Sequence, residues 1–219
     1  MDLQTAFIFD MDGVIVDSNP YHKIALKEFC KKHGRDLSEA QLREKIYGRR
    51  NQDWLTNIFG PLDAETMKRF ADEKEALFRD LYEKDIRPLD GLVDFLNSLN
   101  GLEITRVIAT SAPRANVDFT LRKTGTTKYF STILDDSFVS QGKPNPEVYL
   151  KAAAAVNQDP ACCVVFEDSL AGVSAAKDAG CKVVGITTTH THDELTNTDM
   201  IIDNFTGLDP KLLISRLFS

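Results

Sequence analysis

The sequence predicts an α/β protein: a doubly wound, Rossmann-like parallel sheet core with an inserted, all-helical subdomain. Short apolar segments alternate with helical patterns over 104–202, whereas the stretch 19–87 contains no convincing strand. Short buried strands that alternate with helices are typical of a parallel sheet with helices on both faces. A chain of 219 residues is long enough for one or two domains.

The expected strands are short, apolar and rich in β-branched or aromatic residues, a pattern typical of strands buried on both faces. The first lies close to the N-terminus and the second follows the long helical stretch. The expected strands are 5–9, 104–109, 132–134, 162–166, 182–187 and 199–202.

Helical patterns separate the later strands, at 113–124, 146–156 and 170–179. Gly125 and Gly180 follow two of these patterns directly. Glycine is a common residue just beyond a helix, because it adopts the left-handed conformation that ends many helices without steric cost.

The expected sheet domain comprises 1–18 and 88–219, and the expected helical subdomain comprises 19–87, with loops near its two ends as hinges. Local capping signals divide this subdomain into helices. The first helix has Asn19 as N-cap and Pro20 in its first turn and stops at Gly34, and the second starts with a capping box from Ser38 to Gln41 and stops at Gly48. Asn51 caps a short third helix that ends before Gly60, and Asp63 starts a long charged fourth helix.

The composition is that of an ordinary globular protein with a net charge of -7. This charge argues against a nucleic-acid scaffold and means that an anionic substrate needs a local cation. No apolar run approaches the roughly 18 residues that span a bilayer, and the N-terminus does not resemble a signal peptide. We therefore expect a cytoplasmic protein without nucleic-acid or membrane partners, monomeric by default. The spacing of Cys30, Cys162, Cys163 and Cys181 suggests neither a zinc site nor a disulfide framework.

Polar residues follow the expected strands at the points where ligands bind in open parallel sheets, outside the carboxyl ends of the strands. One pair follows the first strand, one the second and one the fourth, and a lysine precedes the helix at 146–156. The residues expected to gather at this edge are Asp10, Asp12, Thr110, Ser111, Lys143, Glu167 and Asp168.

These residue types suit phosphoryl transfer. Asp10 can attack phosphorus, and Asp12 can protonate the leaving oxygen and then deprotonate a water. A phosphate dianion repels the attacking carboxylate, so we expect Mg²⁺, with Asp10 and Asp168 as side-chain ligands. Lys143 would neutralise developing charge, and the Thr110 hydroxyl would hold a phosphoryl oxygen.

Four segments together resemble the haloacid dehalogenase superfamily, within it the β-phosphoglucomutase-like branch of phosphatases and phosphomutases. They are Phe9-Asp10-Met11-Asp12-Gly13-Val14-Ile15-Val16-Asp17-Ser18, Ile108-Ala109-Thr110-Ser111, Gly142-Lys143-Pro144-Asn145-Pro146 and Phe166-Glu167-Asp168-Ser169-Leu170-Ala171-Gly172-Val173.

The resemblance implies that Asp10 is the nucleophile and a Mg²⁺ ligand, and that Asp12 is the general acid/base and a ligand through its backbone carbonyl. It implies that Thr110 and Lys143 bind the transferred phosphoryl group. Asp168 would bind the metal, with Glu167 as a further ligand or as a partner of the ligands. Backbone N–H groups, among them those of Met11, Asp12 and Ser111, could contribute to the phosphate cradle. The helical insertion would be a cap that closes over the site.

Several cap residues are substrate-binding candidates with an equally ordinary structural alternative. Arg49 and Arg50 could hold a second anionic group of the substrate, or form a solvated basic turn. Asn51 belongs to the same loop and shares this candidacy. His22 could couple the cap to acid/base action or be a partly buried structural histidine. Trp54 could stack on a substrate ring, but a tryptophan in such a helix more often packs in the small core of the cap.

The favoured function is a Mg²⁺-dependent phosphatase that hydrolyses a small phosphorylated metabolite, a sugar phosphate first among them, through an aspartyl-phosphate. The alternative is a β-phosphoglucomutase-type hexose phosphomutase. The mutase pattern has a lysine before the cap-loop glycine and an arginine three residues after it, where this chain has Tyr47 and Asn51. A pyrophosphatase would have glutamate in place of Tyr47. Asp12 argues against a dehalogenase, and the complete set of core residues argues against a non-catalytic phosphometabolite-binding module.

Overall fold

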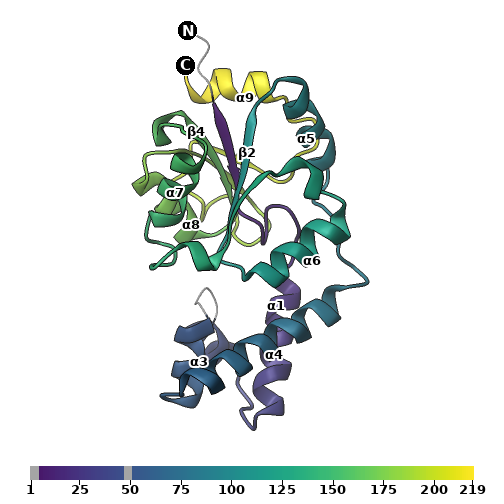
Figure 1. Ribbon diagram of the computed structural model, residues 1–219, viewed down its shortest axis with the longest axis vertical. Helices are drawn as coiled ribbons and strands as arrows, with labels where there is room; N and C mark the ends of the chain where they lie inside the picture. Colours follow the sequence, from purple (N-terminus) through teal and green to yellow (C-terminus); the bar gives the residue numbers. More distant parts are fainter. Residues whose placement is uncertain (1–4, 47–50) are drawn as a thin grey trace. The chain divides into compact units, whose positions relative to one another are not determined.

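The computed structural model describes residues 5–46 and 51–219. The chain divides into two compact units, one formed by Met1–Asp17 with Ile86–Ser219 and the other by Ser18–Asp85. The first unit contains the sheet, and the second consists of helices (Figure 1).

The sheet is parallel throughout, with strand order β3-β2-β1-β4-β5-β6. The chain builds outward from β1 to one edge and then, starting at β4, to the other edge. Two halves wound outward from a central strand confirm the predicted doubly wound α/β class. The strands are β1 (Ala6–Phe9), β2 (Thr105–Ala109), β3 (Thr132–Leu134), β4 (Cys163–Glu167), β5 (Lys182–Ile186) and β6 (Met200–Ile202).

The helices of this unit lie on both faces of the sheet, with α7 and α8 on one side and α5 and α6 on the other (Figure 1). The expected helices at 113–124, 146–156 and 170–179 are present with ends shifted by at most one residue, whereas α5 and α9 are additional to the expected set. The helices are α5 (Leu92–Gly101), α6 (Arg114–Thr124), α7 (Glu147–Ala155), α8 (Leu170–Asp178) and α9 (Pro210–Leu217).

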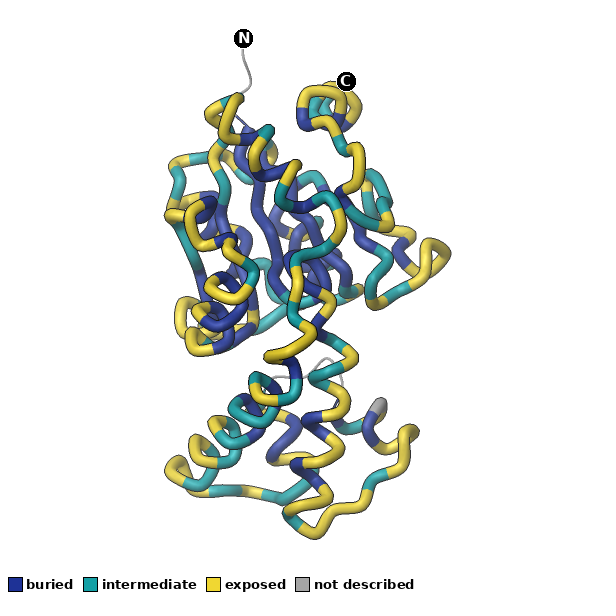
Figure 2. The backbone as a smooth tube through the Cα atoms, turned by 90° about the vertical axis from the view of Figure 1, so that its right-hand side faces the viewer, coloured by how far each residue is buried: buried dark blue, intermediate teal, exposed yellow. Residues whose placement is uncertain are grey.

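Side chains alternate across β1, so its two faces pack differently. Phe7 and Phe9 join Phe166 of β4 and Phe95 of α5 in an aromatic cluster, in which the Phe9 and Phe166 rings stack at 4.8 Å. The other face carries smaller side chains, which pack against the alanines and valines of α7 and α8. All four residues of β1 are completely buried (Figure 2).

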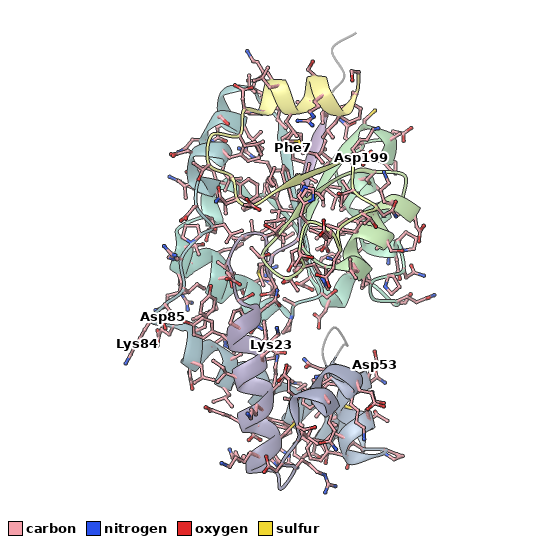
Figure 3. The ribbon with its side chains drawn as sticks, turned by 180° about the vertical axis from the view of Figure 1, so that it is seen from behind. Phe7, Lys23, Asp53, Lys84, Asp85 and Asp199 are labelled. Carbon is pink, nitrogen blue, oxygen red and sulfur yellow. The ribbon has the colours of Figure 1, made fainter. Side chains whose placement is uncertain are left out.

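The side chain of Asp199 forms hydrogen bonds that link β6 to its neighbours in the second half of the sheet. Asp199, labelled with Phe7 in Figure 3, precedes β6. Its Oδ2 accepts hydrogen bonds from the backbone N–H of Val183 at 2.7 Å and from Lys177 Nζ at 2.9 Å. These bonds connect the start of β6 to β5 and to the end of α8, and so help to fix the register of the edge strand.

The helical unit contains α1 (Asn19–Lys32), α2 (Glu39–Lys45), α3 (Asn51–Phe59) and α4 (Ala64–Tyr82). The predicted capping box between Ser38 and Gln41 is present, and Asp63 caps α4. The cap of α1 differs by one residue from the expectation, because Ser18 rather than Asn19 precedes the helix. Asn51 is helical and is the first described residue of α3, and the residues before it lie outside the described part of the chain. The expected stop at Gly48 lies outside the described residues.

The helical unit has its own core. Trp54 is 1% exposed and packs edge-on against Phe29, with ring centroids 5.7 Å apart. Of the two interpretations of Trp54, the structure therefore supports packing in the core. Within the described part of the chain, no helix has the length and apolar character needed to cross a membrane.

Candidate active site

Three carboxylates meet at the carboxyl ends of β1 and β4. Asp10 follows β1 directly, Glu167 is the last residue of β4, and Asp168 comes next. The parallel register sets Phe9 opposite Phe166, so Asp10 stands beside the end of β4. Each residue offers one carboxylate oxygen, and these oxygens lie within 4.8 Å of one another. All three side chains are buried, as expected of a site built into the sheet rather than onto its surface.

Lys143 joins two of these carboxylates. Its Nζ lies 2.8 Å from Asp10 Oδ1 and 2.6 Å from Glu167 Oε1, and the lysine side chain is 9% exposed. A lysine in an ordinary solvated loop would keep its ammonium in water, so the structure supports the interpretation of Lys143 as a site residue. Within the described residues of the cluster, three carboxylates face this one ammonium, and the excess negative charge favours an added cation.

Glu167 has hydrogen-bond partners on both carboxylate oxygens. Oε1 accepts from Lys143 and from the Tyr149 hydroxyl at 2.8 Å. Oε2 accepts from the backbone N–H groups of Asp168 and Ser169, both at 2.9 Å. A carboxylate held so completely suits a residue that orients the lysine and the neighbouring ligand better than it suits a direct metal ligand.

Asp168 is held by two segments that are distant in sequence. The Thr189 hydroxyl donates to Asp168 Oδ2. The second segment is the turn after β1, where a Cβ atom at Gly13 would come within 2.0 Å of the same oxygen. Gly13 also has φ of +80°, a conformation that favours glycine. The turn can therefore approach Asp168 only because this position has no side chain.

The charge states in the cluster follow from burial. Burial raises the pKa of Asp10 to about 7, although the Lys143 ammonium opposes the rise. Burial and the charges of Glu167 and Asp10 raise the pKa of Asp168 well above its usual range. Burial also opposes the charge of Glu167, but Lys143 and the hydrogen bonds hold its pKa below the usual value. Asp10 and Asp168 are thus the two carboxylates that a cation would stabilise most in their charged form.

The remaining core candidates lie at the same sheet edge. Thr110 follows β2 and is buried, and its Oγ1 accepts a hydrogen bond from the backbone N–H of Ala112 at 3.1 Å, which leaves the hydroxyl proton available to a phosphoryl oxygen. Ser111 is exposed and half-buried Asp12 lies in the turn that also contains Gly13. The structure thus brings every core candidate to the ends of β1, β2 and β4.

The cap candidates separate into described and undescribed residues. Arg49 and Arg50, with Tyr47, lie outside the described residues. Asn51 uses its side chain inside the helical unit, where Nδ2 donates to Glu75 at 2.9 Å and Oδ1 accepts from Trp54 Nε1 at 2.9 Å.

His22 also has partners within the helical unit. Its ring stacks on Phe78 with centroids 3.7 Å apart, and its Nδ1 lies 2.9 Å from Lys74 Nζ. Lys74 is itself buried and bonds to Glu75 at 3.0 Å. The substrate-binding roles of His22 and Asn51 stay predictions, and the structure shows that both side chains are held in place.

Tyr149, Thr188 and Thr189 belong to the site but were not expected from the sequence. Tyr149 lies on α7, within the helix whose start follows the Lys143 loop. The two threonines follow β5, one of the strands whose ends carried no candidate in the sequence. A polar run of three threonines directly after an apolar strand was the available signal.

Comparison with known proteins agrees with this geometry. A model of the haloacid dehalogenase-like hydrolase family matches residues 4–180. A phosphorylated carbohydrates phosphatase of Thermotoga maritima is 33% identical, over 80% of this chain and 81% of the relative. The β-phosphoglucomutase of Bacillus subtilis is 31% identical, over 83% and 82%.

A solved structure shows the same fold over nearly the whole chain. It is a HAD hydrolase of family IA, variant 3, from Entamoeba histolytica, with a TM-score of 0.89 and 30% identity. The similarity covers 98% of this chain and 100% of that chain. The sequence resemblance is therefore confirmed, and so is the expectation of an enzyme: the chain belongs to the haloacid dehalogenase-like hydrolase family.

Proposed function

We propose that this enzyme is a Mg²⁺-dependent phosphatase that hydrolyses a small phosphorylated metabolite of the sugar-phosphate class through an aspartyl-phosphate on Asp10. The observation that carries the proposal is the buried group of Asp10, Lys143 and Asp168 at the carboxyl ends of β1 and β4. A carboxylate nucleophile, an ammonium and a second carboxylate within one cluster are the parts that phosphoryl transfer to an aspartate requires. The T. maritima relative, named a phosphorylated carbohydrates phosphatase, supports the substrate class.

The donor set fits Mg²⁺. Carboxylate oxygens are the ligands that Mg²⁺ prefers, and Asp10 and Asp168 offer them within 4.8 Å. The backbone carbonyl of Asp12 would complete the protein's contribution. When bound, Mg²⁺ supplies positive charge that offsets the repulsion between the Asp10 carboxylate and a phosphate dianion.

In the first half of the reaction, an Asp10 oxygen forms a bond to phosphorus while the bond from phosphorus to the substrate oxygen breaks. Asp12 gives its proton to that leaving oxygen, so the product departs as an alcohol. Lys143 lies 2.8 Å from Asp10 and is placed to donate a hydrogen bond to the transferred phosphoryl group and so to offset its negative charge. The Thr110 hydroxyl would donate to another phosphoryl oxygen.

In the second half, the Asp12 carboxylate takes a proton from water and the resulting hydroxide attacks phosphorus. The bond between phosphorus and Asp10 breaks, which releases phosphate and restores the aspartate. We propose that the helical unit Ser18–Asp85 acts as the cap, which would close over the site and limit the entry of bulk water. Arg49, Arg50, Asn51 and His22 are its candidate substrate-binding residues.

The phosphomutase alternative keeps the same core chemistry, with a sugar hydroxyl in place of water in the second half. The B. subtilis relative, a β-phosphoglucomutase, is the observation that favours it. The cap loop argues against it, because Tyr47 and Asn51 occupy the positions of the mutase lysine and arginine. Asn51 also uses its amide inside the helical unit, with Trp54 and Glu75.

One experiment tests both candidates. Purified protein with Mg²⁺ is assayed for phosphate release from a panel of sugar phosphates and, in parallel, for formation of glucose 6-phosphate from β-glucose 1-phosphate. We expect phosphate release from some members of the panel. Isomer formation without phosphate release would favour the mutase, and no reaction in either assay would overturn the proposal.

Two variants test the assigned roles. Asp10→Asn should abolish turnover, because an amide cannot form the phosphoenzyme, whereas the exposed Asp178→Asn should behave like the parent enzyme. Asp12→Asn should fold normally and lose two to four orders of magnitude in rate, as is typical on loss of a general acid/base. Normal turnover of Asp10→Asn would refute the phosphoenzyme.

A further inference from the structure

The loop after β5 contributes two hydroxyl groups to the cluster of carboxylates. The Thr188 hydroxyl donates to the backbone carbonyl of Gly13 at 2.6 Å. The Thr189 hydroxyl donates to Oδ2 of Asp168. Consecutive residues thus bind two different segments of the site, one after β1 and one after β4.

The loop after β5 contacts a turn that follows β1, although these two strands are not neighbours in the sheet. β5 pairs with β4, and β4 lies between β5 and β1. The bond from Thr188 to Gly13 therefore passes over the end of β4, where Asp168 lies, and joins residues 175 positions apart in the sequence. The loop after β5 contacts Asp168 Oδ2 through Thr189, and the Gly13 turn lies against the same oxygen.

The turn that Thr188 holds is itself closely bonded. The Gly13 N–H donates to the Val16 carbonyl at 2.7 Å, and the Ile15 N–H donates to the Met11 carbonyl at 2.8 Å. Asp12 lies inside this turn. The Gly13 carbonyl accepts a hydrogen bond from Thr188. The loop after β5 therefore holds both this turn and, through Thr189, the Asp168 carboxylate.

We propose that Thr189 is a positioning residue of the metal site, which fixes the orientation of the Asp168 carboxylate, and that Thr188 anchors the loop so that Thr189 can do so. This inference rests on the metal-binding part of the proposed function. A carboxylate that can rotate must lose that freedom when it binds a metal, whereas one already held by a hydroxyl does not. Loss of such a supporting hydrogen bond typically costs 10–100-fold in metal affinity.

The chain offers a matched control in the same loop. Thr187 directly precedes the pair, and its hydroxyl donates to Asp203 Oδ1 at 2.6 Å, an exposed contact away from the cluster. Thr187→Val and Thr189→Val each replace a hydroxyl by a methyl group of the same shape. The first removes a hydrogen bond from the loop, and the second removes one from the proposed metal ligand.

The test is isothermal titration of Mg²⁺ into the protein without substrate, with circular dichroism to establish folding. We expect Thr189→Val to weaken Mg²⁺ binding about 10–100-fold, Thr189→Ser to retain affinity within a few-fold, and Thr187→Val to match the parent. The same order should hold for the Mg²⁺ concentration at half-maximal phosphatase activity, with the maximal rate of Thr189→Val largely restored at saturating Mg²⁺. Thr189→Ala serves as a second variant if Thr189→Val does not fold.

The outcomes separate the inference from the function on which it rests. Parent-like Mg²⁺ affinity in Thr189→Val would overturn the positioning role and leave the proposed function intact. Equal losses in Thr187→Val and Thr189→Val would also overturn it, because the loop would then act only as a structural support. A parent protein that binds no Mg²⁺ would overturn the metal assignment itself.

Discussion

Replacing Tyr149 by phenylalanine removes a single buried hydroxyl from the centre of the site. This hydroxyl donates to Glu167 Oε1 at 2.8 Å, and the Tyr149 side chain is completely buried. The ring stays in place, and with it the contact of the Lys143 ammonium 5.0 Å from the ring centroid. Glu167 keeps Lys143 as a partner on the same oxygen, so no acceptor is left unsatisfied.

The size of the effect follows from the charge of the acceptor. A hydrogen bond to a charged group contributes about 1.5–3 kcal/mol to stability, against about 0.5–1.5 kcal/mol for a bond between neutral groups. Glu167 is charged at neutral pH, because Lys143 and its hydrogen bonds hold its pKa below the usual value against the effect of burial. We therefore expect Tyr149→Phe to lower the free energy of unfolding by about 1.5–3 kcal/mol.

Tyr129→Phe is the matched control. Its hydroxyl donates to the neutral side-chain oxygen of Asn97 at 2.7 Å, and Tyr129 is 3% exposed in the same unit. It should lose about 0.5–1.5 kcal/mol. Both losses can be measured by urea denaturation followed by circular dichroism. Trp54 is the only tryptophan and lies in the helical unit, so its fluorescence before urea is added should be nearly the same in both variants and the parent. An equal loss in the two variants would refute the reasoning.

Two further predictions follow from the described geometry. Gly13→Ala should abolish Mg²⁺ binding measured by titration, because its Cβ would overlap Asp168. Gly34→Ala, at φ of +72° with nothing within 4 Å, should cost only about 1–2 kcal/mol of stability in a denaturation curve. The bond to Lys151 and the backbone N–H bonds lower the pKa of Glu147 to about 2. Its stabilising contribution is therefore present above the unfolded value near 4.5 and lost as the pH falls toward 2, so Glu147→Gln should flatten this part of the acid-unfolding curve. An unchanged acid-unfolding curve, or Mg²⁺ binding by Gly13→Ala, would contradict these expectations.

The strands and the core of the site could be predicted because their signals are local. Phe7 and Ile8 lie in an apolar run bounded by Asp10, and a buried strand that ends in a carboxylate is visible in the sequence alone. The convergence of Asp10, Glu167 and Asp168 then follows from one rule about the ends of parallel strands.

The helices α5 and α9 could not be predicted as readily. The first begins after Gly91, which offers no side-chain cap and lies so close to the Thr206 backbone that a Cβ atom would come within 2.3 Å of its nitrogen. The second does have a cap, because the Asp209 side chain accepts from the N–H groups of Lys211 and Leu212. It is a short helix, and its exposed Leu212 weakens the apolar pattern.

The contacts of Tyr149, Thr188 and Thr189 depend on the folded chain. Nothing in the sequence near Thr188 indicates that its hydroxyl meets Gly13, because the geometry arises only when β4 lies between β1 and β5. The same holds for Tyr149, whose position on α7 reads as an ordinary core residue. Which residues support a site depends on contacts between segments that are distant in the sequence, and a single sequence does not indicate these contacts.

The strand order determines which parts of the sheet open first when the protein unfolds locally. Asp10, the proposed nucleophile, follows β1, which has two strands on one side and three on the other. The edges of the sheet, β3 and β6, are three residues long and only partly buried. Such edges open first in local fluctuations, and a central strand opens only with the whole domain. None of the three clustered carboxylates lies on an edge strand, so fraying at either edge would leave the carboxylate cluster assembled until the sheet unfolds as a whole.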